Sequence, residues 1–96
     1  MTGSAVPELE WRQAARNDLR SIIDYIASEN PAAALALLKE IEAKVGHLPE
    51  APKLYRQGRV DGTREMFVRP NYLVIYSETP KTVTILRVLH AAQMWP

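Results

Sequence analysis

One histidine and three arginines in the second half of the chain have the side chains that phosphodiester cleavage requires. A histidine imidazole exchanges protons near neutral pH, so His90 is the best candidate for a general acid or base. The guanidinium groups of Arg64, Arg69 and Arg87 could hold a phosphate. Cleaving RNA through its own 2′-hydroxyl needs a base, an acid and cations placed against the phosphate. These four residues are a minimum set for that reaction.

The same residues also have structural interpretations. His90 lies at the expected end of a strand, where its ring could bind a backbone carbonyl. Arg87 interrupts an apolar strand, so its charge must be paired or reach water. Two alternatives follow for Arg87: an ion pair with Glu65 of a neighbouring strand, or contact with a partner. Arg64 and Glu65 follow a turn glycine, and structural pairing is at least as well supported for them as chemistry.

A proline-containing segment, residues 48–61, has no sustained hydrophobic period and predicts an ordered loop. Its basic and aromatic side chains have no evident packing role, so we expect them to contact the target. The Trp95 indole either anchors the tail to the core or is exposed for a partner. The predicted target-binding residues are Lys53, Tyr55, Arg56, Arg59, Arg69 and Trp95.

Two helices and a set of strands must position these residues. Apolar residues at spacings of three and four predict helices from about Arg12 to Ser28 and from about Pro31 to Val45, the second with Gly46 as its C-cap. Asn30 supplies an N-cap and Pro31 fits the first helical position, so the helices form a short-linked antiparallel hairpin. The apolar stripes are Trp11, Ala15, Leu19, Ile22, Ile23 and Ile26, then Ala34, Leu38, Ile41, Val45 and Leu48.

Period-two alternation then predicts an antiparallel meander of three strands, with a short extra strand before the first helix. The strands are Arg64–Arg69, Tyr72–Ser77 and Thr82–His90, and the extra one lies within Val6–Trp11. We therefore expect a two-layer α+β fold, an N-terminal helical hairpin packed on a small antiparallel sheet of three to four strands. Strict alternation puts Arg87 and His90 on opposite faces unless a bulge intervenes. Tyr72 and Tyr76 share a face with Val74, which favours core packing over base stacking.

Length and composition limit the remaining possibilities. The 96 residues predict one domain, residues 1–96, with residues 1–5 outside its ordered part. Cysteine is absent and the two histidines lack nearby carboxylate pairs, so we expect neither a metal nor a cofactor. The longest apolar run, Tyr72–Tyr76, is far shorter than the roughly 20 residues of a membrane span. We therefore expect a cytoplasmic protein without membrane contact.

The charges are distributed unequally along the chain. Residues 1–50 carry five basic and eight acidic side chains, a net charge of −3, whereas residues 51–96 carry seven and three, a net charge of +4. If the halves form different layers, one face is basic and suits an anionic partner. The alternative is a solvated surface with scattered charge.

Several short motifs, taken in order, resemble the RelE/ParE toxin superfamily, and specifically its ParE branch. They are Gly62-x-Arg64-Glu65, Asn71-Tyr72-x-x-x-Tyr76, and Arg87-Val88-Leu89-His90 with the closing pair Trp95-Pro96. The segments "DLRSIIDYI" and "LPEAPKLY" extend the resemblance over nearly the whole chain. The resemblance implies a growth-inhibiting, plasmid-stabilising toxin of a type II toxin–antitoxin system, held inactive by a cognate antitoxin in a hetero-oligomer.

The resemblance leaves two targets open, because RelE-like toxins cut mRNA on the ribosome and ParE-like toxins act on DNA gyrase. RelE-like nucleases typically carry an arginine directly after the tyrosine of the central strand, and basic or aromatic residues beyond the last strand. Here Leu73 follows Tyr72, and Ala91 and Ala92 follow His90. The resemblance thus favours gyrase inhibition by binding. The alternatives are a ribosome-dependent mRNA endonuclease that uses His90, Arg87 and Arg64, and an inactive remnant that only binds its antitoxin.

Overall fold

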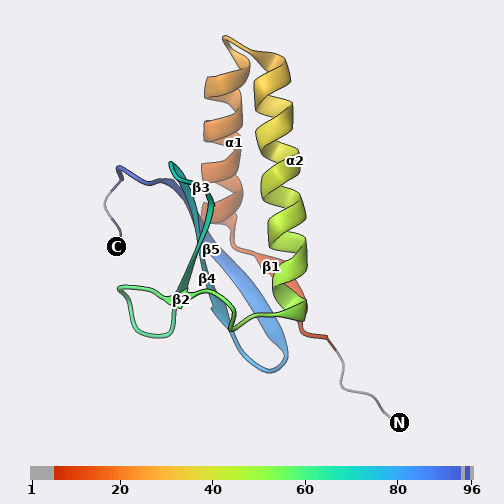
Figure 1. Ribbon diagram of the computed structural model, residues 1–96, viewed down its shortest axis with the longest axis vertical. Coiled ribbons are helices and arrows are strands. Elements are labelled where there is room, and N and C mark those ends of the chain that lie inside the picture. The colour runs from red at the N-terminus through yellow and green to blue at the C-terminus, as the bar shows by residue number, and fades with distance from the viewer. Residues whose placement is uncertain (1–5, 94, 96) are drawn as a thin grey trace.

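The computed structural model describes residues 6–93 and 95, and it has two layers, a helical hairpin and a twisted sheet (Figure 1). The α+β class and the N-terminal hairpin are confirmed. Expectations for residues 1–5 and for Pro96 lie outside the described residues. In chain order the elements are β1 (Glu8–Trp11), α1 (Gln13–Ala27), α2 (Pro31–His47), the 3₁₀ turn η1 (Leu48–Glu50), β2 (Arg56–Gln57), β3 (Arg64–Arg69), β4 (Tyr72–Glu78) and β5 (Thr82–His90).

The sheet has five strands in the order β1-β5-β4-β3-β2 and is mixed. The prediction of a purely antiparallel sheet of three to four strands is therefore wrong in two respects. β1 lies parallel to β5, and β2, inside the expected loop, pairs antiparallel with β3. The short strand expected within Val6–Trp11 is present, but its parallel pairing with β5 joins distant parts of the chain without a turn signal, and the two residues of β2 are too few to show a hydrophobic period.

The helices begin and end close to the expected residues, with one correction. The side chain of Asn30 accepts the backbone N–H of Ala33 at 3.0 Å and Pro31 takes the first helical turn, as expected. However, α2 continues to His47, so Gly46 lies inside the helix and Leu48 is the C-cap. Gly62 has a positive φ of 84°, which marks the turn before β3.

The main core lies between the hairpin and one face of the sheet. Its fully buried helical members include Leu37, Ile41 and Val45 of α2, but α1 contributes only Ala15. The remaining apolar stripe of α1 is only half-buried; its residues are Leu19, Ile22, Ile23 and Ile26. Figure 1 shows that the hairpin extends well beyond the sheet, so the turns near its tip pack on each other alone. One flank of α1 is therefore left without a partner layer.

β5 contains a bulge just before the last functional candidates, Arg87 and His90. Ile75 pairs with Arg87 and Tyr76 with Ile85, so Leu86 is an extra residue. Ile85 before the bulge and Val88 after it both join the helix-side core, whereas Leu86 packs on the opposite face. The pairing is regular again from Arg87 to His90, so Arg87, opposite Ile75, and His90, opposite Tyr72, leave the strand on opposite faces, as strict alternation predicts. Tyr76 is fully buried and Tyr72 packs against the same core, which confirms their core role.

Within residues 6–93 and 95, no helix combines the length and the apolar character that crossing a membrane requires.

Candidate functional site

Four arginines of the second half each face a carboxylate. Two of these carboxylates come from the helices, so the ion pairs join the acidic half of the chain to the basic half. The expected basic face is not formed by these arginines, because their charges are neutralised within the fold. The shortest nitrogen–oxygen distances are 2.8 Å for Arg56–Glu65, 3.5 Å for Arg64–Glu78, 2.8 Å for Arg69–Glu40 and 2.6 Å for Arg87–Asp18.

Arg87 is held by Asp18 of α1 and not by Glu65, so that expected partner is wrong. Its Nε donates to Oδ2 at 2.6 Å and its Nη2 donates to Oδ1 at 2.9 Å. The side-chain hydrogen bond to Asp18 raises the pKa of Arg87 above its ordinary value. Oδ2 also accepts the backbone N–H of Val88 at 3.0 Å, because β1 stops pairing with β5 at Ile85 and leaves the later edge open to α1. The Arg87 guanidinium is therefore fixed to α1 by a two-bond ion pair.

Arg64 turns toward the preceding loop and fixes it. Its Nη1 donates to the Tyr55 carbonyl at 2.7 Å, and its Nε faces Glu78. The Tyr76 hydroxyl donates to the Pro52 carbonyl at 2.7 Å, and burial raises the pKa of Tyr76 to about 12. The hydrogen bonds to the Tyr55 and Pro52 carbonyls therefore fasten the loop that carries Lys53 and Tyr55 to β3 and β4.

Glu65 organises the β2–β3 turn from a buried position. Its Oε1 accepts two hydrogen bonds from Arg56, at 2.8 and 3.2 Å, and its Oε2 accepts the backbone N–H of Arg59 at 3.4 Å. The Arg56 guanidinium also lies 5.3 Å from the centre of the Phe67 ring. Arg56 therefore has a packing role, contrary to the expectation for its cluster. Lys53 and Arg59 keep exposed side chains.

Trp95 packs on the face of the sheet that the helices leave open. A second apolar cluster there consists of Leu73, Ile75 and Leu89, with Leu86 and Trp95 packed against it. The Arg59 Nη1 lies 3.4 Å from the Trp95 carbonyl, so the structure brings two predicted target-binding residues together. Arg69 lies apart from them, paired with Glu40 of α2. The anchoring interpretation of Trp95 is supported.

His90 is fixed by contacts other than the expected backbone carbonyl. Its Nδ1 accepts the backbone N–H of Ala92 at 3.1 Å, and its ring meets Tyr72 edge-on with 5.4 Å between the ring centres. His90 pairs with Tyr72 on β4, whereas Arg64 pairs with Tyr76, four residues along that strand. At the rise of a β-strand this separates His90 from Arg64 by roughly 13 Å. The three residues suggested for cleavage therefore do not converge on one phosphate.

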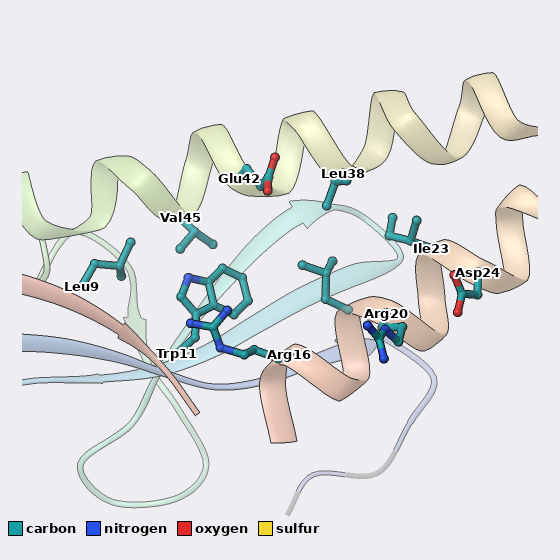
Figure 2. A pocket seen from close by; sticks show the side chains of 10 residues that line it. Leu9, Trp11, Arg16, Arg20, Ile23, Asp24, Leu38, Glu42 and Val45 are labelled. Atoms are coloured by element: carbon teal, nitrogen blue, oxygen red, sulfur yellow. The ribbon is translucent and has the colours of Figure 1, made fainter. Parts of the chain in front are cut away.

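An open groove of about 420 Å³ lies between α1, α2 and β1. Figure 2 shows Leu9 and Trp11 of β1 closing one end, with α1 and α2 forming the two sides. The groove has an apolar floor and a charged rim. The floor consists of Leu9, Trp11, Leu19, Ile23, Leu38 and Val45, and the rim consists of Arg16, Arg20 and Asp24 of α1 and Glu42 of α2.

Sequence reasoning missed the rim of this groove. It assigned Leu38 to the core stripe of α2, but Leu37 is the buried residue and Leu38 is half-buried in the groove. The available signal was the recurrence of arginine every four residues at Arg12, Arg16 and Arg20, which places cations along one side of a helix.

Comparison with known proteins gives a consistent result. The family described as "ParE toxin of type II toxin-antitoxin system, parDE" matches residues 9–95. A putative toxin, Y4kP, from Sinorhizobium fredii is 34% identical over 88 residues, which cover 92% of this chain and 92% of that protein. Toxin RelE2 from Caulobacter vibrioides is 31% identical over 87 residues, 91% of this chain and 98% of that protein. The chromosomal ParDE toxin–antitoxin system from P. aeruginosa contains a chain of the same fold, with a TM-score of 0.78, 22% identity, and coverage of 88% of this chain and 96% of that one.

Proposed function

Since the chain belongs to the ParE toxin family of type II toxin–antitoxin systems, we propose that it inhibits DNA gyrase by binding and not by cutting RNA. One observation carries the choice: the arginines that could hold a phosphate are each paired with a carboxylate. A phosphate that reaches Arg69 or Arg87 meets a neutral ion pair. Binding it would require separating Asp18 from Arg87, which leaves a carboxylate beside the phosphate.

The proposed contact surface consists of the loop before β2, which Arg64 and Tyr76 hold by hydrogen bonds, and the turn between β2 and β3. Among the predicted target-binding residues, Lys53 and Arg59 have exposed side chains that form no ion pair within the part of the chain that the structure describes. Arg56 keeps a side chain that is 64% exposed although Glu65 pairs with it. Trp95 supplies apolar surface beside Arg59, whereas Tyr55 packs against the helix-side core and is proposed as a contact through its exposed part. Arg69 lies away from this surface and is proposed only as a contact at its margin.

Supercoiling by purified gyrase tests the proposal. Addition of the chain is expected to block supercoiling at concentrations that leave translated mRNA intact in primer extension. Codon-specific cleavage on ribosomes would instead establish the second candidate, a ribosome-dependent endonuclease. The relative named RelE2 and the exposed His90 favour that candidate. A chain that does neither and still binds an antitoxin would be an inactive remnant.

We also propose that an antitoxin neutralises the chain in a cytoplasmic hetero-oligomer. The ParDE system that shares its fold supports such a partner. Part of an antitoxin that is disordered when free could fold into the groove between the helices and cover the half-buried stripe of α1. Copurification with the product of an adjacent small gene tests this proposal. Failure of the chain to bind that product would contradict it.

A further inference from the structure

The charged rim of the groove has an order along α1. Arg16, Arg20 and Asp24 follow one another at intervals of four residues, so each lies about 6 Å further along the helix than the last. The rim of α1 therefore carries two positive charges and then a negative one. Glu42 carries a negative charge on the opposite side (Figure 2).

The two rim arginines differ from those of the sheet because neither has a carboxylate within ion-pair distance among residues 6–93 and 95. Asp24 is one turn from Arg20 but forms no ion pair with it. An unpaired guanidinium beside an apolar floor retains its full capacity for a planar, two-bond contact with a carboxylate. The groove thus combines apolar surface, which gives affinity, with uncommitted charge, which gives selectivity.

We propose that the order of charges along this rim, here called the charge code, selects and orients an acidic helix of the neutralising antitoxin. This inference rests on the proposed function. The helix places leucine-like side chains on the floor and two carboxylates, one turn apart, on Arg16 and Arg20. It places a cation one turn further, against Asp24. A helix fits better than an extended strand, because side chains line both walls and a helix satisfies its own backbone groups.

The order of charges makes the code directional. A segment bound in the reverse direction brings its cation against Arg16 and its acids toward Asp24, so both ends repel. A segment with acids on its other flank meets Glu42 and is rejected for the same reason. Apolar contacts alone would accept either direction.

A display library tests the code on the purified chain. The library contains amphipathic helical peptides of about 15 residues, the length of α1, with leucines fixed on one face and each flanking position either Glu or Lys. The wild type is expected to enrich two Glu one turn apart with Lys one turn beyond them, in the order Glu, Glu, Lys at i, i+4 and i+8 for a helix parallel to α1 and in the reverse order for an antiparallel one. The double variant Arg16→Glu/Arg20→Glu is expected to enrich Lys at the two Glu positions and to bind the original peptides about tenfold more weakly.

Lys39→Glu is the matched control, because Lys39 is an exposed cation of α2 that does not line the groove. It should enrich the same peptides as the wild type, and all three proteins should unfold at similar temperatures. The inference is overturned if the three proteins enrich the same charges, or if the wild type enriches none. The peptide display uses neither gyrase nor cell growth. Its result can therefore refute the charge code without affecting the proposal of gyrase inhibition, and a negative supercoiling assay leaves the charge code untouched.

Discussion

Asp18 in the first helix accepts two hydrogen bonds from the Arg87 guanidinium and a third from the neighbouring backbone N–H of Val88. One carboxylate therefore closes the open edge of the last strand and neutralises one of the three arginines that could hold a phosphate. The same contact stabilises the fold and removes a cation from any reaction at this end of the sheet.

Replacing Asp18 with alanine should lower the free energy of unfolding by about 2 kcal/mol, because it leaves Arg87 and the Val88 N–H without their acceptor. Urea titration measures the change. Asp24→Ala is the control, since Asp24 is an exposed residue of the same helix without such contacts, and it should cost less than about 0.5 kcal/mol. Equal losses would refute the structural role of Asp18.

Two glycines should respond oppositely to alanine. A Cβ at Gly58 would lie 2.4 Å from the Thr63 hydroxyl, so Gly58→Ala should cost about 1–3 kcal/mol of folding free energy. Gly46 lies inside α2 with open space around a new Cβ, so Gly46→Ala should stabilise by about 0.5–1 kcal/mol. Denaturant titration of both variants tests the tight β2–β3 turn, and a harmless Gly58→Ala would show that the turn is looser than described.

Tyr76 gives the fold a specific response to alkaline pH. Its pKa is raised from 10.0 to about 12 by burial, so the folded state keeps a proton that the unfolded state loses between these values. Its contribution to stability is complete below pH 10 and falls as the pH rises toward 12, by up to about 1.4 kcal/mol per pH unit.

Tyr76→Phe should lose about 1 kcal/mol at neutral pH, because the hydrogen bond to the Pro52 carbonyl is gone. The stability difference between this variant and the wild type should then narrow above pH 10 and reverse in sign as the pH approaches 12. A difference that stays constant up to pH 12 would contradict the burial of the hydroxyl.

Local patterns were sufficient for the helices and the meander. Asn30 and Pro31 mark the second helix by their own chemistry, and alternation located β3, β4 and β5 within one residue. Contacts between distant residues left no such pattern. Three features depend on how helices and strands pack against one another once they have formed. They are the β1–β5 pairing, the single extra residue Leu86 and the Asp18–Arg87 ion pair.

Charge counting by halves of the chain failed for the same reason. The excess of four positive charges in the second half is halved where Asp18 and Glu40 of the first half reach Arg87 and Arg69. The cations without an ion pair that line the groove belong to the acidic half, at Arg16 and Arg20.

The proposed gyrase contact predicts a selective charge effect. Reversing Lys53 and Arg59 together to glutamate should weaken gyrase inhibition by about tenfold or more, since both cations are exposed on the proposed surface. Lys81→Glu is the control, because Lys81 is exposed in the turn before β5, outside that surface. Dose–response curves of supercoiling measure the effect, and equal behaviour of the two variants would place the contact elsewhere.

Comparing the wild type with His90→Ala in parallel supercoiling and ribosome-dependent RNA cleavage assays tests the central claim most directly. His90 binds the Ala92 N–H and contacts Tyr72 at the end of the sheet, while Arg69 and Arg87 are each paired with a carboxylate. The predicted result is gyrase inhibition of equal strength, within about twofold, by both proteins and no cut RNA from either. RNA cleavage by the wild type that His90→Ala abolishes, without inhibition of gyrase, would contradict the account.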